Sequence, residues 1–189
     1  MIGGRLSGRR FRVPQGAVRP TSDRVREALF GRLGGLEGVR VLDLYAGSGA
    51  LGIEAISRGA AKTTFVEKEA RTLAVLRANL AELGIDSIAA VIAGDVRAAV
   101  RRLGRVEERF DLVLVDPPYA SEEPALAFEA LVASAVLNPG AMVVLERDRR
   151  HPSPSVEGLP ALDERRYGDT VLARFIAGQT EPGRIGRTG

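Results

Sequence analysis

The sequence predicts an α/β fold: a doubly wound, mostly parallel sheet of seven strands with an antiparallel hairpin at one edge. Apolar strand patterns alternate with helical patterns between Arg40 and Glu146, and such alternation is typical of a parallel sheet covered by helices on both faces. After His151 the pattern changes to two adjacent strands with no helix between them. The length of 189 residues suits one such domain with a short appendage.

The first elements are an arm and a helix. Residues 1–20 are rich in Gly, Arg and Pro, which predicts an extended arm or a small hairpin. Thr21 or Ser22 can cap the helix that follows, and Gly34 and Gly35 end it. The domain proper is therefore expected to begin at residue 21.

Strands and helices then alternate through the middle of the chain. The expected strands are residues 39–44, 62–67, 87–93, 110–116 and 141–146. The expected helices are residues 50–58, 69–83, 95–103 and 124–135. Helical crossovers of this kind return the chain to the same end of the sheet, as parallel pairing requires.

The last elements form the predicted hairpin. The segment LPALDERRYGDTVLARFIA, residues 159–177, contains two strands joined at Tyr167-Gly168-Asp169. Residues 178–189 have no apolar period and are expected to form a disordered tail. The domain is therefore expected to span residues 21–177.

Positive charge is concentrated at the N-terminus. Residues 1–40 hold nine arginines and three acids, a net charge of +6, whereas the rest of the chain carries 18 basic and 21 acidic residues, a net charge of −3. A basic arm on a mildly acidic body fits a polyanion such as RNA, although codon bias toward arginine is an alternative explanation. The candidate RNA-binding residues are Arg5, Arg9, Arg10, Arg12 and Arg19.

The composition excludes several kinds of chemistry. The chain has no cysteine and one histidine, His151, which excludes disulfides, thiolate zinc sites and cysteine nucleophiles. His151 lies in the turn-like stretch HPSPS and is expected to be a surface residue. No apolar run has the length of a membrane span, and the first residues lack the apolar core of a signal peptide, so we expect a cytoplasmic protein.

A glycine-rich loop follows the first predicted strand. In DLYAGSGALG, Gly47, Gly49 and Gly52 match the G-x-G-x-x-G pattern of nucleotide-binding turns, and Glu67 at the end of the next strand can accept hydrogen bonds from a ribose. Asp43 precedes the loop and would repel a pyrophosphate but attract a cation. This favours S-adenosylmethionine over a nicotinamide dinucleotide. Asp95 can contact the adenine amino group or simply cap its helix.

The stretch FDLVLVDPPY, residues 110–119, ends a buried strand with a carboxylate, two prolines and an aromatic ring. The prolines remove backbone donors and stiffen the chain, so acceptors are left beside a flat ring. Such a site can hold the N–H groups of an exocyclic amine and direct its lone pair toward a methyl group. We therefore expect direct in-line transfer, accelerated by orientation and electrostatics.

Five segments resemble, in this order and spacing, the RsmD family of class I S-adenosylmethionine-dependent methyltransferases: IGGRLSGRRFRVP, RPTSDRVREALF, VLDLYAGSGALGIEAISRGA, FVEKEA and FDLVLVDPPY. The resemblance implies a Rossmann-like sheet and methylation of guanine N2 in 16S rRNA of the small ribosomal subunit or its late precursor. It implies catalytic roles for Asp116, Pro117, Pro118 and Tyr119. With no cysteine and one histidine, the composition predicts no metal site. The resemblance implies cofactor contacts by Thr21, Arg24, Asp43, Tyr45, Ala46, Gly47, Ser48, Gly49, Glu67, Lys68, Asp95 and Val96.

Three other functions fit parts of the sequence. An adenine-N6 methyltransferase acting on DNA or RNA would use the same DPPY site, but sequence-specific DNA enzymes generally need a recognition domain for which 189 residues leave no room. The glycine loop alone fits a nicotinamide oxidoreductase, and the arm alone fits a non-catalytic RNA-binding module.

Overall fold

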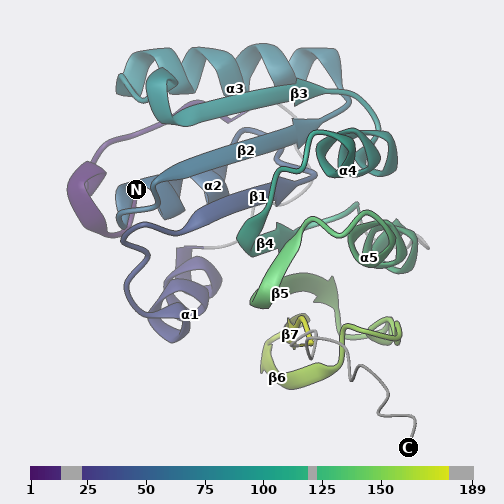
Figure 1. The fold of residues 1–189 in the computed structure, drawn as a ribbon. Helices are drawn as coiled ribbons and strands as arrows, with labels where there is room; N and C mark the ends of the chain where they lie inside the picture. Colours follow the sequence, from purple (N-terminus) through teal and green to yellow (C-terminus); the bar gives the residue numbers. More distant parts are fainter. Residues whose placement is uncertain (14–22, 119–122, 179–189) are drawn as a thin grey trace, which may run out of the picture.

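The computed structural model describes residues 1–13, 23–118 and 123–178, which form one seven-stranded sheet between two layers of helices (Figure 1). The strands are β1 (Arg40–Leu44), β2 (Lys62–Glu67), β3 (Ala89–Ala93), β4 (Phe110–Val115), β5 (Leu137–Asp148), β6 (Ala161–Tyr167) and β7 (Thr170–Ile176). The helices are α1 (Asp23–Leu33), α2 (Ala50–Ser57), α3 (Ala70–Leu83), α4 (Val96–Arg105) and α5 (Glu123–Ala133), with short 3-10 turns η1 (Gly4–Leu6) and η2 (Asp86–Ile88).

The strand order is β3-β2-β1-β4-β5-β7-β6. The first five of these strands pair in parallel, and β7 runs antiparallel to both β5 and β6. The predicted doubly wound sheet with an antiparallel edge hairpin is confirmed. The chain winds outward from β1 to β3 and then crosses to β4, so the order reverses between β1 and β4. Open α/β sheets bind ligands at such a reversal, beyond the carboxyl ends of the strands.

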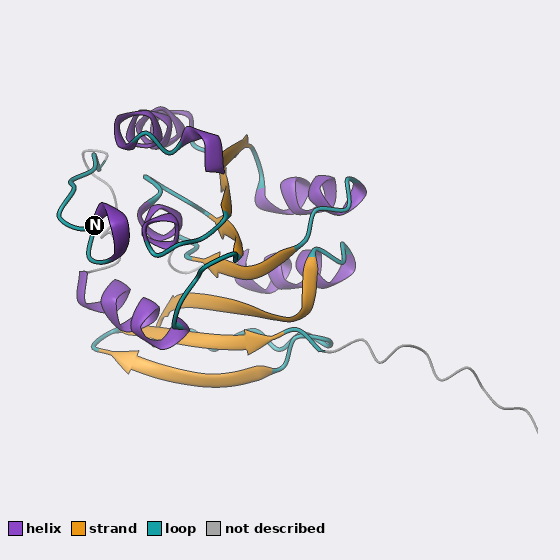
Figure 2. Cartoon of the chain, turned by 60° about the vertical axis from the view of Figure 1, so that its left-hand side comes forward, coloured by secondary structure: helices purple, strands orange, loops and turns teal. Residues whose placement is uncertain are grey.

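Alternate residues of the central strands face different helix layers, and Figure 2 shows the sheet between them. Leu42 and Leu44 of β1 pack with residues of α4 and α5, whereas Val41 packs with residues of α1 and α2. On the α4 and α5 side, Phe128 meets Phe175 of β7 edge to face, with ring centroids 4.8 Å apart. The strands therefore read as continuous apolar runs because both of their faces are buried.

Strand β5 is longer than the predicted residues 141–146, since it spans Leu137–Asp148. At its start Leu137 pairs with Phe110 of β4, before an irregularity in the register. At its end Arg147 and Asp148 pair with Val171 and Thr170 of β7. Both extensions are strands because they pair with β4 and β7, not because they are apolar. The hydrophobic pattern of the sequence therefore did not predict them.

The arm does not form a hairpin within residues 1–13, where the structure has the turn η1 and no strand. Its backbone is held instead by two side chains of α2. The Glu54 carboxylate accepts from the N–H groups of Ile2 and Gly3, both at 2.9 Å, and Ser57 Oγ accepts from the N–H of Leu6 at 2.9 Å. The arm is thus packed against the domain by its main chain, which leaves the charged side chains Arg5 and Arg10 exposed.

Some expectations fall outside the described residues. These are the helix cap at Thr21 or Ser22, the arginine Arg19, the aromatic residue Tyr119 and the tail beyond Gly178. In the described ranges no helix is both long and apolar enough to cross a membrane.

Candidate active site

The glycine-rich loop connects β1 to α2 and owes its shape to three glycines. Gly47 and Gly49 have φ of 56° and 90°, a left-handed conformation that other residues rarely adopt. A Cβ on Gly49 would lie 2.5 Å from Leu76 Cδ1, and a Cβ on Gly52 would lie 2.3 Å from the ring of Phe65. Gly49 and Gly52 are therefore required by packing within the protein, whereas Gly47 leaves its surroundings open for a ligand.

Tyr45, which precedes these glycines in the same loop, connects the loop to the segment that follows the DPPY stretch. Tyr45 has φ of 60°, and its hydroxyl donates to the Glu123 carboxylate at 2.9 Å. Burial and this hydrogen bond raise the pKa of Tyr45 above its ordinary range, so the phenol keeps its proton. Since Glu123 begins α5, this contact ties the predicted cofactor loop to the helix that follows the predicted catalytic residues.

Asp43, at the end of β1, is a buried carboxyl with 1% of its surface exposed. One oxygen accepts from the N–H of Gly52 at 2.9 Å. Burial raises the pKa of Asp43 to about 8, against the effect of that hydrogen bond, and the negative charges of Asp116 and Glu67 add to the shift. A cation bound between these three acids would reverse the shift and favour the ionised carboxylate.

Glu67, at the end of β2, holds the glycine loop from the other side. Its Oε2 accepts from the N–H of Gly47 at 2.9 Å, and its Oε1 accepts from the N–H groups of Lys68 and Glu69, each at 2.8 Å. An ionised carboxylate has about four acceptor positions, so Glu67 retains capacity for a hydroxyl donor. Its role as a ribose acceptor stays a prediction.

Asp95 follows β3 and caps α4, accepting from the N–H of Ala98 at 3.0 Å. The cap that the sequence allowed is therefore present, and an additional contact to adenine stays a prediction. Val96 is buried behind this cap, and Lys68 is exposed beside Glu67. Ala46 is fixed by donating its N–H to Val66 O at 2.9 Å.

Asp116 follows β4, where the parallel pairing of Val115 with Leu44 places it at the level of Tyr45. The side chain of Asp116 is half-buried, Pro117 is buried and Pro118 is exposed. The structure thus brings Asp43, Glu67 and Asp116 together at the carboxyl ends of three neighbouring strands. Arg24 lies exposed on α1, and within the described residues it forms no hydrogen bond or ion pair with the glycine loop.

Asn79 of α3 is a site residue that the sequence analysis missed. Its side-chain amide donates to Ser48 O of the glycine loop and to Arg12 O of the arm, both at 2.9 Å, and its oxygen accepts from the N–H of Arg12 at 2.7 Å. Only 1% of Asn79 is exposed. The available signal was one polar residue on the apolar face that Leu76 and Leu80 define.

We predict that Asn79→Ala lowers both thermal stability and cofactor affinity, because it leaves buried backbone groups of the arm and the loop without partners. The loss of stability should be about 1–3 kcal/mol. Thermal melts and calorimetry with the methyl donor would measure the two effects, with Arg77→Ala on the exposed side of α3 as a control. Unchanged affinity in Asn79→Ala would show that the loop does not depend on this amide.

The comparison with known proteins agrees with this geometry. A family model described as conserved hypothetical protein 95 matches residues 1–176. The chain belongs to this family. The match runs from the arm through β7, so the family includes the arm as well as the sheet.

Similar proteins with established names confirm the resemblance of this chain to the RsmD family. The ribosomal RNA small subunit methyltransferase D of Escherichia coli is 32% identical over 177 residues, which are 93% of this chain and 87% of that protein. The protein of the same name from Haemophilus influenzae is 32% identical over 170 residues, 89% of this chain and 88% of that protein. Among solved structures, yhhF of Escherichia coli has a TM-score of 0.82 at 31% identity and covers 94% of this chain and 97% of its own.

Proposed function

We propose that the protein transfers a methyl group from S-adenosylmethionine to the exocyclic N2 amine of a guanine in 16S rRNA of the small ribosomal subunit. The observation that carries the proposal is the group of carboxyls Asp43, Glu67 and Asp116 around a glycine loop, in a chain whose relatives are named ribosomal RNA small subunit methyltransferases. The relatives support rRNA methylation, and the guanine N2 target comes from the motif resemblance.

The donor set fits S-adenosylmethionine better than a dinucleotide. When bound, S-adenosylmethionine supplies an electrophilic methyl group on a sulfonium. Asp43 would attract the donor's positive charges and Glu67 its ribose hydroxyls, while Asp95 would meet the adenine amine. A pyrophosphate at the same loop would meet the carboxylates of Glu67 and Asp116 and would oppose the ionisation of Asp43. Among the site residues that the structure describes, only Lys68 and Arg24 are positive, and both are exposed.

The DPPY segment would orient the acceptor base. The Asp116 carboxylate and a carbonyl of the following prolines accept the two N–H bonds of the guanine amine, which directs the nitrogen lone pair toward the methyl group. A donor held at the glycine loop would supply the methyl group in line with this lone pair, and the proton that the methylated amine loses would pass to the Asp116 carboxylate or to water. The chain's contribution is orientation and a negative charge where the amine becomes positive.

The arm would hold the RNA by its exposed arginines. Arg5 and Arg10 are exposed, whereas Arg12 pairs with Glu82 at 3.3 Å and Arg9 donates to Glu82 O at 3.0 Å. Arginines on a docked arm keep their positive charge available to phosphates while the backbone fixes their position.

Transfer of labelled methyl from S-adenosylmethionine to undermodified small subunits, followed by nucleoside analysis, tests the proposal. We expect N2-methylguanosine in 16S rRNA. Labelled N6-methyladenosine would instead support the alternative that uses the same DPPY chemistry. Calorimetry should show binding of S-adenosylmethionine and none of nicotinamide dinucleotides, and the opposite pattern would rule out a methyltransferase.

A further inference from the structure

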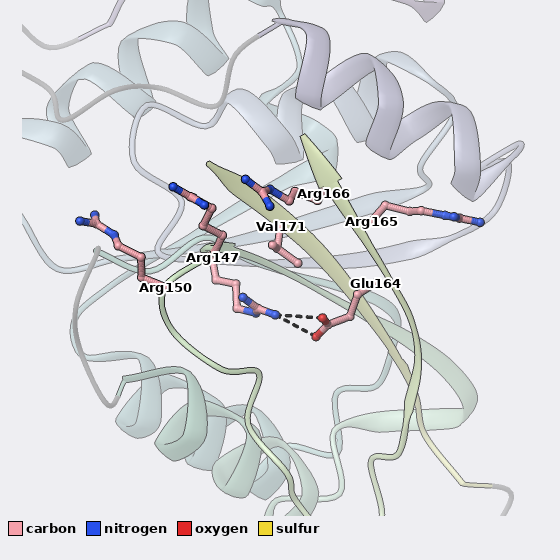
Figure 3. A pocket seen from close by; sticks show the side chains of 7 residues that line it. Arg147, Arg150, Glu164, Arg165, Arg166 and Val171 are labelled. Atoms are coloured by element: carbon pink, nitrogen blue, oxygen red, sulfur yellow. Dashed lines mark hydrogen bonds and ion pairs between the residues drawn. The ribbon is translucent and has the colours of Figure 1, made fainter. Parts of the chain in front are cut away.

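An open pocket of about 460 Å³ lies on the β5–β7–β6 edge of the sheet, away from the cofactor loop. Five arginines line this edge pocket, and they come from the end of β5, from the turn that follows it and from β6. They are Arg147, Arg149, Arg150, Arg165 and Arg166. Figure 3 labels four of them, Arg147, Arg150, Arg165 and Arg166.

Arg147 forms the floor of the edge pocket. Its side chain is 11% exposed, and its Nη2 donates to both oxygens of Glu164, at 3.0 and 2.9 Å (Figure 3). Its Nε donates to Ser153 Oγ at 2.8 Å and its Nη1 to His151 O at 2.6 Å. With these partners Arg147 is committed to the protein and supports the other arginines.

The remaining arginines are directed outward. The side chain of Arg150 is 76% exposed, and Asp148 fixes it by accepting from Nε and Nη2, each at 2.9 Å. This pair holds the pKa of Asp148 well below its usual range. Arg149 and Asp169 form a pair at 2.8 Å in which both side chains are exposed. The carboxylate of Asp148 thus orients a guanidinium whose Nη1 forms no hydrogen bond within the described part of the chain.

Arg165 and Arg166 of β6 supply the unbalanced charge of this edge. Because side chains alternate along a strand, Arg166 lies on the face of Arg147 and Glu164, and Arg165 extends from the opposite face of the edge strand (Figure 3). Arg166 donates from Nε to Gly168 O at 2.8 Å, and both Arg165 and Arg166 are exposed. Within the described ranges no carboxylate pairs with either of them. Three of the five arginines are paired, Arg147 with Glu164, Arg149 with Asp169 and Arg150 with Asp148. Five arginines and these three acids leave a net charge of +2, on a body that is otherwise mildly acidic.

The edge pocket lies at the same end of the sheet as Asp116. Val115 of β4 pairs with Leu145 of β5, so Arg147 stands about one residue beyond the level of Asp116. Adjacent strands are about 4.8 Å apart, so β6 lies about 14 Å from β4, across β5 and β7. A nucleic acid strand advances roughly 3.4 Å per phosphate, so about four nucleotides would span this separation.

We propose that the edge pocket binds phosphates of the rRNA strand on one side of the target base. This inference rests on the proposed function. Guanidinium groups match phosphate oxygens in pairs, and groups already oriented by carboxylates lose less freedom on binding. The arm packs on α2 and α3, on the other half of the sheet, so two basic surfaces flank Asp116.

The double variant Arg165→Ala/Arg166→Ala tests the edge pocket. If each arginine neutralises one phosphate, the slope of log affinity against log salt should fall by about 1.4–1.8, and the KM for small subunits should rise by about tenfold or more at low salt. Turnover at saturating substrate and S-adenosylmethionine affinity should not change, because neither residue contacts the cofactor loop. The matched control is Arg101→Ala/Arg102→Ala, two exposed arginines in the half of α4 that points away from this end of the sheet.

Other outcomes separate the inference from the function on which it rests. If the double variant has the same salt slope and KM as the control, the edge pocket does not bind phosphate. Methyl transfer by the wild type would still support the proposed function in that case. Absence of methyl transfer by the wild type would contradict the proposed function. The edge pocket would then be tested by comparing how the wild type and the double variant bind protein-free 16S rRNA. An effect seen with assembled subunits but not with protein-free rRNA would identify a protein partner and overturn phosphate binding.

Two further variants distinguish a loss of phosphate binding from a loss of folding. Arg165→Lys/Arg166→Lys keeps the charge and should recover most of the salt slope. If the alanine variant melts lower than the wild type, Arg150→Gln provides the same test from β5, with a slope decrease of about 0.7–0.9. A wild-type slope in Arg150→Gln together with no recovery by the lysine variant would again overturn the proposal.

Discussion

Replacement of Asp116 by Ala should reduce methyl transfer by a factor of about 10²–10³ or more while changing S-adenosylmethionine affinity less than about tenfold. Asp116 stands at the end of β4 and is proposed to orient the target amine, an interaction that matters most in the transition state. Its loss should therefore appear in turnover rather than in cofactor binding.

The effect of Asp116 on Asp43 supports the small change in cofactor affinity. The negative charge of Asp116 helps to raise the pKa of Asp43, so Asp116→Ala should favour ionised Asp43. The additional negative charge on Asp43 would attract a cationic ligand and would offset part of the charge lost with Asp116. Cofactor binding is measured by calorimetry, and turnover by single-turnover transfer to undermodified small subunits.

Asp111 at the opposite end of β4 provides a matched control. Its carboxylate accepts from the N–H of Arg40 at 2.9 Å and from the Asn138 amide at 2.6 Å, so it has a structural role far from the carboxyl end. Asp111→Ala should lower the melting temperature and leave transfer by the folded protein unchanged. Wild-type turnover in Asp116→Ala would show that this carboxylate is not the amine acceptor.

Asp43→Asn should weaken S-adenosylmethionine binding by about a hundredfold or more, because it removes the buried charge proposed to meet the donor's cation. Asparagine keeps an oxygen that can accept from the N–H of Gly52, so the loop should fold normally. Calorimetry measures the affinity, and near wild-type binding by Asp43→Asn would show that the cation is held elsewhere.

The raised pKa of Asp43 makes this binding dependent on pH. A pKa of about 8 means that the free protein carries a protonated Asp43 at neutral pH. A bound cation favours the ionised form, so binding should release a proton and affinity should rise with pH until about pH 8. Calorimetry in buffers of different ionisation enthalpy would detect the released proton, which should be absent in Asp43→Asn.

The same shift predicts how stability changes with pH. The pKa of Asp43 in the folded protein lies above the unfolded value of about 3.9, so its contribution to stability is full below pH 4 and is lost as the pH rises through 8. The melting temperature of the ligand-free wild type should therefore fall relative to Asp43→Asn between about pH 4 and pH 8, and the difference should level off above that pH. Parallel melting curves for the two proteins across this range would contradict the shift.

The sequence alone determined the parallel sheet and the group of acids at the carboxyl ends of its strands. Apolar runs separated by helical patterns predicted the parallel strands because each strand buries both faces. The acids Asp43, Glu67, Asp95 and Asp116 each lie at or just beyond the carboxyl end of a strand. Parallel strands end at the same edge of the sheet, so the proximity of these acids could be inferred without coordinates. Local hydrophobic periodicity and the direction of the strands carried this information.

Contacts between distant segments were decided by the tertiary structure. Glu54 and Asn79 looked like ordinary helix residues, yet they hold the arm across 51 and 67 positions of the chain because its backbone N–H groups need buried acceptors. The arginines of the edge pocket come from the end of β5, the turn after it and β6, which are brought together only because β7 pairs with both strands. Periodicity encodes which face of an element is buried, whereas the partner of a buried polar group or of an edge strand depends on how the whole chain packs.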